Sequence, residues 1–253
     1  MEPIIRGDCL EIADILGRDY SYQSCWSSTE AFSRYVKSLK RNSAWSDSGW
    51  EGAKDFTGTK TMEEALHLAD GHWDEGADKV QRMVDLIHAN RPTRKLPKKY
   101  GITGALPSIP RAVSGNILNM LQLETGKNKR RPVITLISNM CVNWTVNKDV
   151  LANKSAAMTA VIDQIESAGY SVEVISTAIT GANRNKKGDG KYMAATSVMA
   201  KTSDQPVDIK RLAFALGHPS MFRRMVFSDW GTEPSAKAGL GMGLGYVNDP
   251  QPN

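Results

Sequence analysis

The pattern of apolar and polar residues is clearest between residues 132 and 230, where it predicts alternating strands and helices. Val133 to Ser138 is a continuous apolar run of strand length, typical of a strand buried on both faces. Asn153 to Ala168 carries apolar residues at helical spacing, and Gly169 suits the end of a helix. Tyr170 to Thr180 alternates as a second strand. Because such crossovers are right-handed, we expect the two strands to be adjacent and parallel.

The same region predicts a third strand and two further helices. Lys191 to Lys201 is long enough to pair with the second strand in an antiparallel arrangement. Val207 to Leu216 is expected to be a helix, and a shorter helix should run from about Pro219 to Phe227. The chain from Gly231 onward has the composition of a loop-like tail.

The first ninety residues are dominated by helical patterns. Thr29 to Lys40 has apolar residues at helical spacing. Thr61 and Glu64 form the signature of a capping box, and a second helix should run from about Trp73 to Ala89. We therefore expect a helical hairpin with a structural role.

Together these patterns predict an α/β fold, a small sheet flanked by helices with an N-terminal, mostly helical annex. The predicted regions are a helical region at 1–90, a basic proline-containing connecting segment at 91–131, an α/β core at 132–230 and a glycine-rich tail at 231–253. Within the connecting segment, Ile102 to Pro110 is too apolar for a free tether, so we expect it to pack on the core. Ala112 to Leu121 is expected to form a short buried helix.

Charge is concentrated in that connecting segment. It holds ten basic residues and one acidic residue, a net +9, whereas the whole chain has a formal net charge of +5. A basic segment within an otherwise mildly acidic chain is typical of phosphate recognition. The alternative is a solvated linker. The candidate nucleic-acid contacts are Arg91, Arg94, Lys95, Lys98, Lys99, Lys127, Lys129, Arg130 and Arg131.

Composition excludes several classes of protein. Of 253 residues, 41% are hydrophobic and 23% are charged, which is ordinary for a folded domain and excludes a disordered chain. No apolar run approaches the roughly 20 residues of a membrane helix. Cys9, Cys25 and Cys141 are too few and too scattered for a disulfide framework or a zinc site, which indicates a reduced, intracellular compartment.

The sequence contains no recognisable catalytic motif. The alternating glycines at 239–245 lack the flanking strand and helix of a dinucleotide site. His218 is best interpreted as part of a helix junction. Of Arg223 and Arg224, we expect at least one to hold a carboxylate or a strand-end carbonyl. We therefore expect no catalytic residues, no enzyme activity and no cofactor.

Three motifs carry a family resemblance. They are Phe56-Thr57-Gly58-Thr59 with the following Gly71-His72-Trp73, Pro107-Ser108-Ile109-Pro110, and the stretch from Leu212 to Arg224. Together they resemble an uncharacterised bacteriophage family catalogued as a domain of unknown function. The resemblance implies a link to single-stranded-DNA-binding accessory proteins of N4-like phages.

The strand and helix order also resembles a von Willebrand A fold. That fold often holds a metal through Asp-x-Ser-x-Ser after its first strand, where this chain has Ser138-Asn139-Met140-Cys141-Val142. Because the acidic ligand is missing, we expect no metal site.

The leading hypothesis is a phage-encoded, non-enzymatic accessory protein of the host cytoplasm. It would bind nucleic acid, with single-stranded DNA favoured, or a phage or host polymerase, and no membrane. The alternative is a protein–protein adaptor with a metal-free von Willebrand A-like fold, which would use the crevice at the carboxyl ends of the strands.

Overall fold

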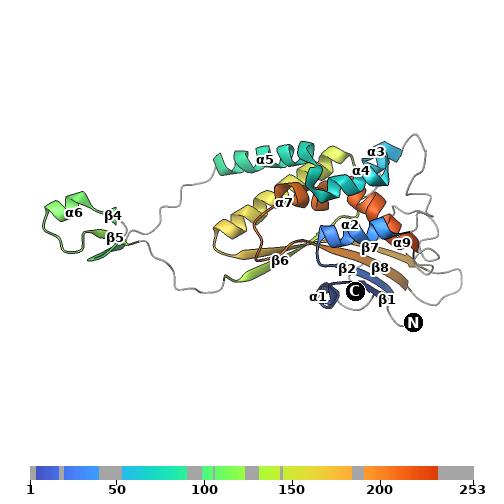
Figure 1. Cartoon of the computed structure of the whole chain (residues 1–253), viewed down its shortest axis with the longest axis horizontal. Coiled ribbons are helices and arrows are strands. Elements are labelled where there is room, and N and C mark those ends of the chain that lie inside the picture. The colour runs from blue at the N-terminus through green and yellow to red at the C-terminus, as the bar shows by residue number, and fades with distance from the viewer. Residues whose placement is uncertain are drawn as a thin grey trace.

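A five-stranded, mostly parallel sheet forms the centre of the molecule (Figure 1). The structure is a computed structural model, and it describes residues 4–16, 20–39, 53–89, 99–104, 106–122, 131–142, 145–183 and 191–232. The strand order is β1-β2-β8-β7-β6, in which only the β7–β8 pair is antiparallel. The strands are β1 (Ile4–Gly7), β2 (Tyr22–Trp26), β6 (Val133–Asn139), β7 (Ser171–Asn183) and β8 (Lys191–Lys201).

The predicted strand–helix–strand unit is confirmed, but the expected burial of its first strand on both faces is wrong. Strand β6 lies at the edge of the sheet, and Val133 and Ile137 are 51% and 46% exposed. Strands β6 and β7 are adjacent and parallel, with Val133 opposite Ser171. Helix α7 (Lys148–Ser167) crosses between them and begins earlier than expected, because the Asn147 side chain caps it by accepting a hydrogen bond from the Asp149 N–H at 3.2 Å. The helix ends before Gly169, which has a φ of 98°. The antiparallel pairing of the third strand is also confirmed.

The N-terminal region, expected to be mostly helical, also supplies strands β1 and β2 to the main sheet. Strand β2 lies parallel to β8, and Trp26 is opposite Val198. Every residue of β2 is buried, including the polar Gln23 and Ser24. A five-residue strand that contains polar residues and pairs with distant parts of the chain has no local pattern that identifies it. The first ninety residues therefore complete the sheet of the core.

Helices cover both faces of the sheet unequally (Figure 1). Helix α1 (Leu10–Leu16) packs on one face, where Ile12 contacts a cluster that includes Cys25 and Ile175. The other helices of the main body lie on the opposite face around a larger core that includes Phe32 and Trp230. These helices are α2 (Thr29–Ser38), α3 (Ala53–Thr57), α4 (Met62–His67), the π-helix η1 (Leu68–His72), α5 (Asp74–Ala89), α7, α8 (Ile209–Gly217), the π-helix η2 (Met221–Val226) and α9 (Phe227–Thr232).

The two residues of the predicted capping box start helix α4, although the return bond of Glu64 reaches the residue before the N-cap. The Thr61 hydroxyl accepts a hydrogen bond from the Glu64 N–H at 3.1 Å, and the Glu64 carboxylate accepts one from the Lys60 N–H at 2.6 Å. The π-helix η1 then separates α4 from α5, with Gly71 at a φ of 97°. The predicted pair of helical segments is therefore present, joined at the glycine that the sequence marks.

The connecting segment neither packs on the core nor forms the expected buried helix from Ala112 to Leu121. Residues 99–122 form a separate antiparallel sheet in the order β3-β5-β4, with one short helix. These elements are β3 (Lys99–Gly101), β4 (Leu106–Pro107), α6 (Ile109–Val113) and β5 (Met120–Gln122). Ile102 is 69% exposed, so this apolar stretch does not pack on the core. The helix expected from Ala112 ends at Val113, because the chain turns back to pair β5 with β3 and β4.

None of the helices in the described ranges is long and apolar enough to span a bilayer.

Candidate functional site

Most of the predicted nucleic-acid contacts fall outside the described residues. This is so for Arg91, Arg94, Lys95, Lys98, Lys127, Lys129 and Arg130. Lys99 begins β3, and Arg131 is exposed two residues before β6. The described structure therefore places the two ends of the basic segment on the chain but does not bring its cations together, and the nucleic-acid site stays a prediction.

The small sheet between these ends has a defined geometry. Tyr100, Leu121 and Leu106 lie opposite one another across its three strands. The Arg111 guanidinium carbon lies 4.0 Å from the centre of the Tyr100 ring, which is a cation–π contact. Its Nη1 also donates a hydrogen bond to the Leu118 carbonyl at 3.3 Å. Arg111 therefore joins helix α6 to the sheet.

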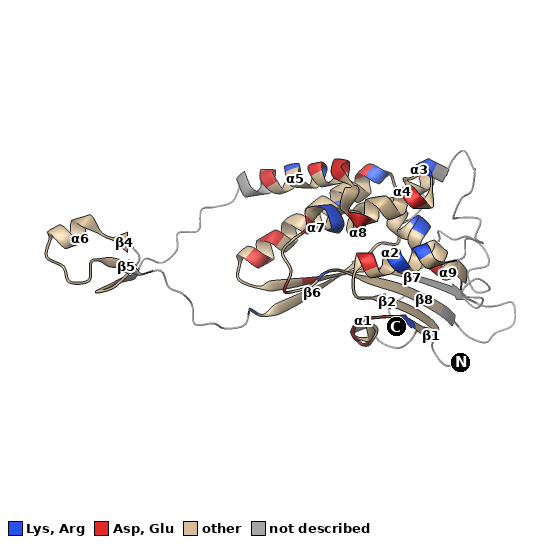
Figure 2. Cartoon of the chain, in the orientation of Figure 1, with Lys and Arg blue, Asp and Glu red and all other residues tan. Residues whose placement is uncertain are grey.

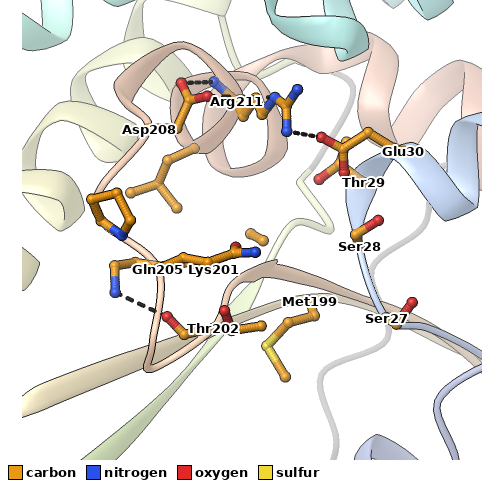
Figure 3. Close-up of a pocket in the computed structure, with 13 residues that line it drawn as sticks. Ser27, Ser28, Thr29, Glu30, Met199, Lys201, Thr202, Gln205, Asp208 and Arg211 are labelled. Carbon is orange, nitrogen blue, oxygen red and sulfur yellow. Dashed lines mark hydrogen bonds and ion pairs between the residues drawn. The ribbon is translucent and has the colours of Figure 1, made fainter.

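A second candidate site is a cleft of about 330 Å³ at the carboxyl ends of β2 and β8 (Figure 3). Because these two strands are parallel, the polypeptide leaves both of them at the same edge of the sheet. Open α/β sheets commonly bind ligands at this edge. The walls come from the start of α2, the end of β8 and the loop that leads into α8. The lining residues are Ser27, Ser28, Thr29, Glu30, Met199, Ala200, Lys201, Thr202, Gln205, Pro206, Asp208, Arg211 and Leu212.

Two capped helix starts face this cleft. The Ser28 side chain caps α2 by accepting a hydrogen bond from the Ala31 N–H at 3.1 Å. The Asp208 carboxylate caps α8 by accepting from the Lys210 N–H at 3.1 Å. The amino ends of helices carry partial positive charge. The sequence alone does not predict this site, although serine, threonine or aspartate before a helical pattern is the signal that marks such a helix start.

Ion pairs balance the cations of the cleft. Arg211 on α8 pairs with Glu30 on α2 and, at 3.4 Å, with Asp208 (Figure 3). The side chain of Lys201 is 3% exposed, and its Nζ pairs with the Glu166 carboxylate at 2.6 Å. The Lys201 Nζ also donates to two backbone carbonyls, those of Val172 at 2.9 Å and Thr202 at 3.1 Å.

The pairing of its cations with carboxylates decides which ligands the cleft can bind. Both cations are engaged by carboxylates, and the lining contains no histidine or cysteine. The hydroxyl and amide groups of Ser27, Thr29 and Gln205 can donate and accept hydrogen bonds. This arrangement suits a polar group of low net charge, such as a side chain or backbone of a peptide.

Helix α9 carries a fully buried carboxylate, that of Asp229. Asp229 is 0% exposed and accepts hydrogen bonds from the hydroxyls of Tyr22 at 2.7 Å, Thr196 at 2.8 Å and Tyr35 at 3.0 Å. The Arg6 Nη1 donates to the Tyr35 hydroxyl at 2.7 Å. Residues from β1, β2, α2, β8 and α9 thus meet at one polar cluster in the core.

Burial sets the protonation of this cluster. It raises the pKa of Asp229, although its hydrogen bonds favour the ionised form and partly oppose the shift. Burial and the Asp229 carboxylate both raise the pKa of Tyr22. Because neither group lines the cleft, we interpret the cluster as a structural element that ties α9 to the sheet.

The expected structural role of His218 is confirmed. It ends helix α8, and its Nδ1 accepts a hydrogen bond from the Ser220 N–H at 3.1 Å. The ring stacks on Phe214 with centroids 5.1 Å apart. Burial lowers the pKa of His218 to about 3, so the ring is neutral at physiological pH.

Both neighbouring arginines are buried and have the expected structural role, but the partners shown differ from the expected carboxylate or strand-end carbonyl. Arg223 Nη1 donates to the Phe56 carbonyl at 2.7 Å. Arg224 Nη2 donates to the carbonyls of Thr59 at 2.7 Å and Lys60 at 2.8 Å. Their partners lie in and after helix α3 rather than at a strand end.

Ser138 and Asn139, at the positions of the von Willebrand A metal motif, make other contacts. The Ser138 hydroxyl contacts the Met158 sulfur at 3.3 Å, and the Asn139 side chain accepts from the Cys141 N–H at 2.8 Å. Within the part of the chain that the structure describes, no group of three or more His, Cys, Asp or Glu residues could hold a metal. The three cysteines are free thiols, and burial raises the pKa of both Cys25 and Cys141 to about 12.

The fold and the cleft define a mixed α/β protein with a mostly parallel sheet flanked by helices and an accessible site at the strand ends. The chain belongs to the family described as Domain of unknown function (DUF7192), whose model matches residues 17–253. Comparison with curated proteins finds no match, and neither does comparison with solved structures.

Proposed function

We propose that this chain is a nucleic-acid-binding protein and that its basic segment, residues 91–131, contacts phosphates. The observation that carries this proposal is the net charge of +9 in a segment that has its own small sheet and exposed side chains. Lysine and arginine side chains that contact phosphates release counterions from nucleic acid, which supplies most of the affinity.

Among its described residues, the main body mixes positive and negative side chains. Figure 2 shows acidic and basic residues interspersed along α5 and α7. Asp74 on α5 pairs with Lys210 at 2.5 Å, and Asp149 on α7 pairs with Lys79 at 2.9 Å. Mixed charges of this kind favour solubility over attraction of a polyanion. The basic segment is therefore the surface where the proposal places the nucleic acid.

The proposed origin and biological setting of the protein rest on the sequence resemblance. The protein would be a non-enzymatic accessory protein of a bacteriophage, related to single-stranded-DNA-binding proteins of N4-like phages and acting in the host cytoplasm on nucleic acid or with a polymerase. The strand, helix, strand, strand, helix order from β6 to α8 supports a von Willebrand A-like core.

Removing four clustered cations should weaken binding. We expect the combined replacement of Lys127, Lys129, Arg130 and Arg131 by alanine to lower nucleic-acid affinity about equally for different sequences. Each phosphate contact on a single strand contributes roughly 0.7 to the slope of log affinity against log salt, so the slope should flatten by about 2 to 3. Fluorescence anisotropy with labelled oligonucleotides between about 50 and 200 mM salt measures both effects.

A matched control removes the same charge from the main body. Arg34, Lys37, Lys54 and Arg82 are exposed, and replacing these four by alanine should leave the slope unchanged. If the variant in the basic segment is folded and binds like the parent protein at every salt concentration, the segment does not contact phosphates.

The adaptor function is a second candidate, favoured by the cleft at the ends of β2 and β8. Its compensated charges and hydroxyl groups suit a peptide segment of a partner protein better than a phosphate. A partner that stays bound after nuclease treatment, and that is lost when Gln205 and Thr29 are replaced by alanine, would support this function. A partner released by nuclease would favour the nucleic-acid function instead.

A further inference from the structure

Two of the three free cysteines meet at the edge of the main sheet. Cys25 is the fourth residue of β2 and is 1% exposed, whereas Cys9 lies in the turn between β1 and α1 and is partly exposed. The Cys9 N–H donates a hydrogen bond to the Cys25 carbonyl at 3.3 Å. A backbone hydrogen bond holds the Cα atoms of its two residues within about 7 Å, and disulfides span Cα separations of about 4.4–6.8 Å.

Both thiols lie on the same face of the sheet. Cys25 belongs to the apolar cluster that α1 forms with the sheet through Ile12, and Cys9 packs against this cluster. Cys141 belongs instead to the larger core on the opposite face. Cys9 and Cys25 are therefore the two cysteines that the fold pairs.

The turn that carries Cys9 is fixed against the end of β2. Gly7 has a φ of 112°, and a Cβ atom there would lie 1.8 Å from the Cys25 carbonyl oxygen, so the two backbones are in direct contact. The Asp8 carboxylate accepts hydrogen bonds from the Ser27 N–H at 2.7 Å and from the Ser27 hydroxyl at 2.8 Å. The two cysteines are thus held together before any bond forms between them, which favours their reaction with each other.

The surroundings of the two thiols set the order in which they react. Burial, and after it the neighbouring Cys9 thiol, raises the pKa of Cys25 to about 12, so Cys25 stays protonated and shielded from solvent. Cys9 is the more accessible thiol of the pair. An oxidant that arrives from solvent therefore meets Cys9 first.

We propose that Cys9 and Cys25 form a reversible disulfide when the protein meets a hydroperoxide. With hydrogen peroxide, the Cys9 sulfur takes one oxygen as a sulfenic acid, the O–O bond breaks, and the second oxygen leaves as water. The Cys25 sulfur then displaces the hydroxyl group from the Cys9 sulfur, and the Cys25 proton leaves with it as a second water. One peroxide thereby gains two electrons, and two thiols become one S–S bond that a dithiol reductant can reopen.

The bond would tie the edge strand β1 and helix α1 covalently to β2. It closes a loop from residue 9 to residue 25, and closing a loop of this length removes conformational freedom from the unfolded chain. The oxidised chain should therefore be more stable than the reduced chain. The inference is independent of the proposed nucleic-acid function, because it uses no residue of the basic segment.

The experiment treats the folded, full chain with hydrogen peroxide, blocks the remaining thiols by alkylation and digests the product with trypsin in the absence of reductant. Cleavage after Arg6, Arg18 and Arg34 places the two cysteines in separate peptides, 7–18 and 19–34. Mass spectrometry should find these peptides joined, lighter than their sum by two hydrogen atoms, and separated again by dithiothreitol. The oxidised chain should run as a monomer on a non-reducing gel, with a Tm about 6–12 °C above that of the reduced chain.

Two variants separate the pair from the third thiol. Cys9→Ser changes the partly exposed partner and should lose both the joined peptides and the rise in Tm. Cys141→Ala is the matched control, because burial also raises the pKa of Cys141 to about 12, and it should keep both. Joined peptides that contain Cys141, a disulfide between two chains, a Cys9–Cys25 bond that forms only in urea, or oxidation of Cys9 to a sulfinic acid without a bond to Cys25 would each overturn the inference.

Discussion

Replacing Asp229 by alanine should lower the free energy of unfolding by about 4 kcal/mol, because it leaves several buried hydroxyl groups without their acceptor. The Tyr22 and Thr196 hydroxyls donate to the two oxygens of this carboxylate at 2.7 and 2.8 Å inside the core. Each buried donor that loses its partner costs about 1–3 kcal/mol. Urea denaturation followed by circular dichroism measures the change.

Two milder variants separate the carboxylate from its surroundings. Asp229→Asn keeps one acceptor oxygen and should cost about half as much as alanine. Tyr35→Phe removes a single, partly buried donor and should cost about 1 kcal/mol. Equal stabilities for the alanine variant and the parent protein would show that the cluster does not tie α9 to the sheet.

The pH dependence of stability offers an independent test of the same carboxylate. Because burial raises the pKa of Asp229, the folded chain retains a proton that the unfolded chain releases above about pH 4. Stability contributed by this group is therefore present below that pH and declines as the pH rises through the folded pKa. Asp229→Asn should remove this decline, so the stability of the parent relative to the variant should fall with rising pH.

Replacing Arg224 by alanine should lower the free energy of unfolding by about 3 kcal/mol. The side chain is 1% exposed, and its Nη2 holds the Thr59 and Lys60 carbonyls, which join helix α3 to α4. Without the guanidinium these carbonyls are buried with fewer donors, and a cavity is left behind. Thermal or urea denaturation measures the loss.

Arg224→Lys keeps the charge but replaces the planar fork by one ammonium group, so we expect a loss of about 1–2 kcal/mol. Arg82→Ala on the exposed face of α5 should change stability by less than about 0.5 kcal/mol. A similar loss for Arg82 and Arg224 would contradict the assigned role of Arg224 in holding the segment between α3 and α4.

The parts of the fold that the sequence predicts are those encoded locally. The apolar run of β6, the helix that ends just before Gly169 and the alternation of β7 each need only neighbouring residues to be recognised. The capping pair Thr61 and Glu64 is local as well. In each case the local pattern identifies the element correctly, although the apolar run of β6 predicts a burial on both faces that an edge strand does not have.

The parts that the sequence does not predict depend on distant partners. Strand β2 contains Gln23 and Ser24, and only its position between β1 and β8 makes these residues buried. The cleft joins Glu30 to Arg211 from helices far apart in the chain, so no spacing rule brings them together. The apolar stretch around Ile102 fits a core equally well by composition, yet it forms a sheet of its own.

The pairing of β2 with β8 has a consequence for synthesis of the chain. Trp26 leaves the ribosome roughly 170 residues before its partner Val198, a delay of about 10–30 s at 5–20 residues per second. Strands β6, β7 and β8 are close in sequence and can assemble as a unit, whereas β1 and β2 must wait to join its edge. Completion of the sheet is therefore a late, non-local step of folding, and a nascent chain halted before β8 would display β2 as a strand without its partner.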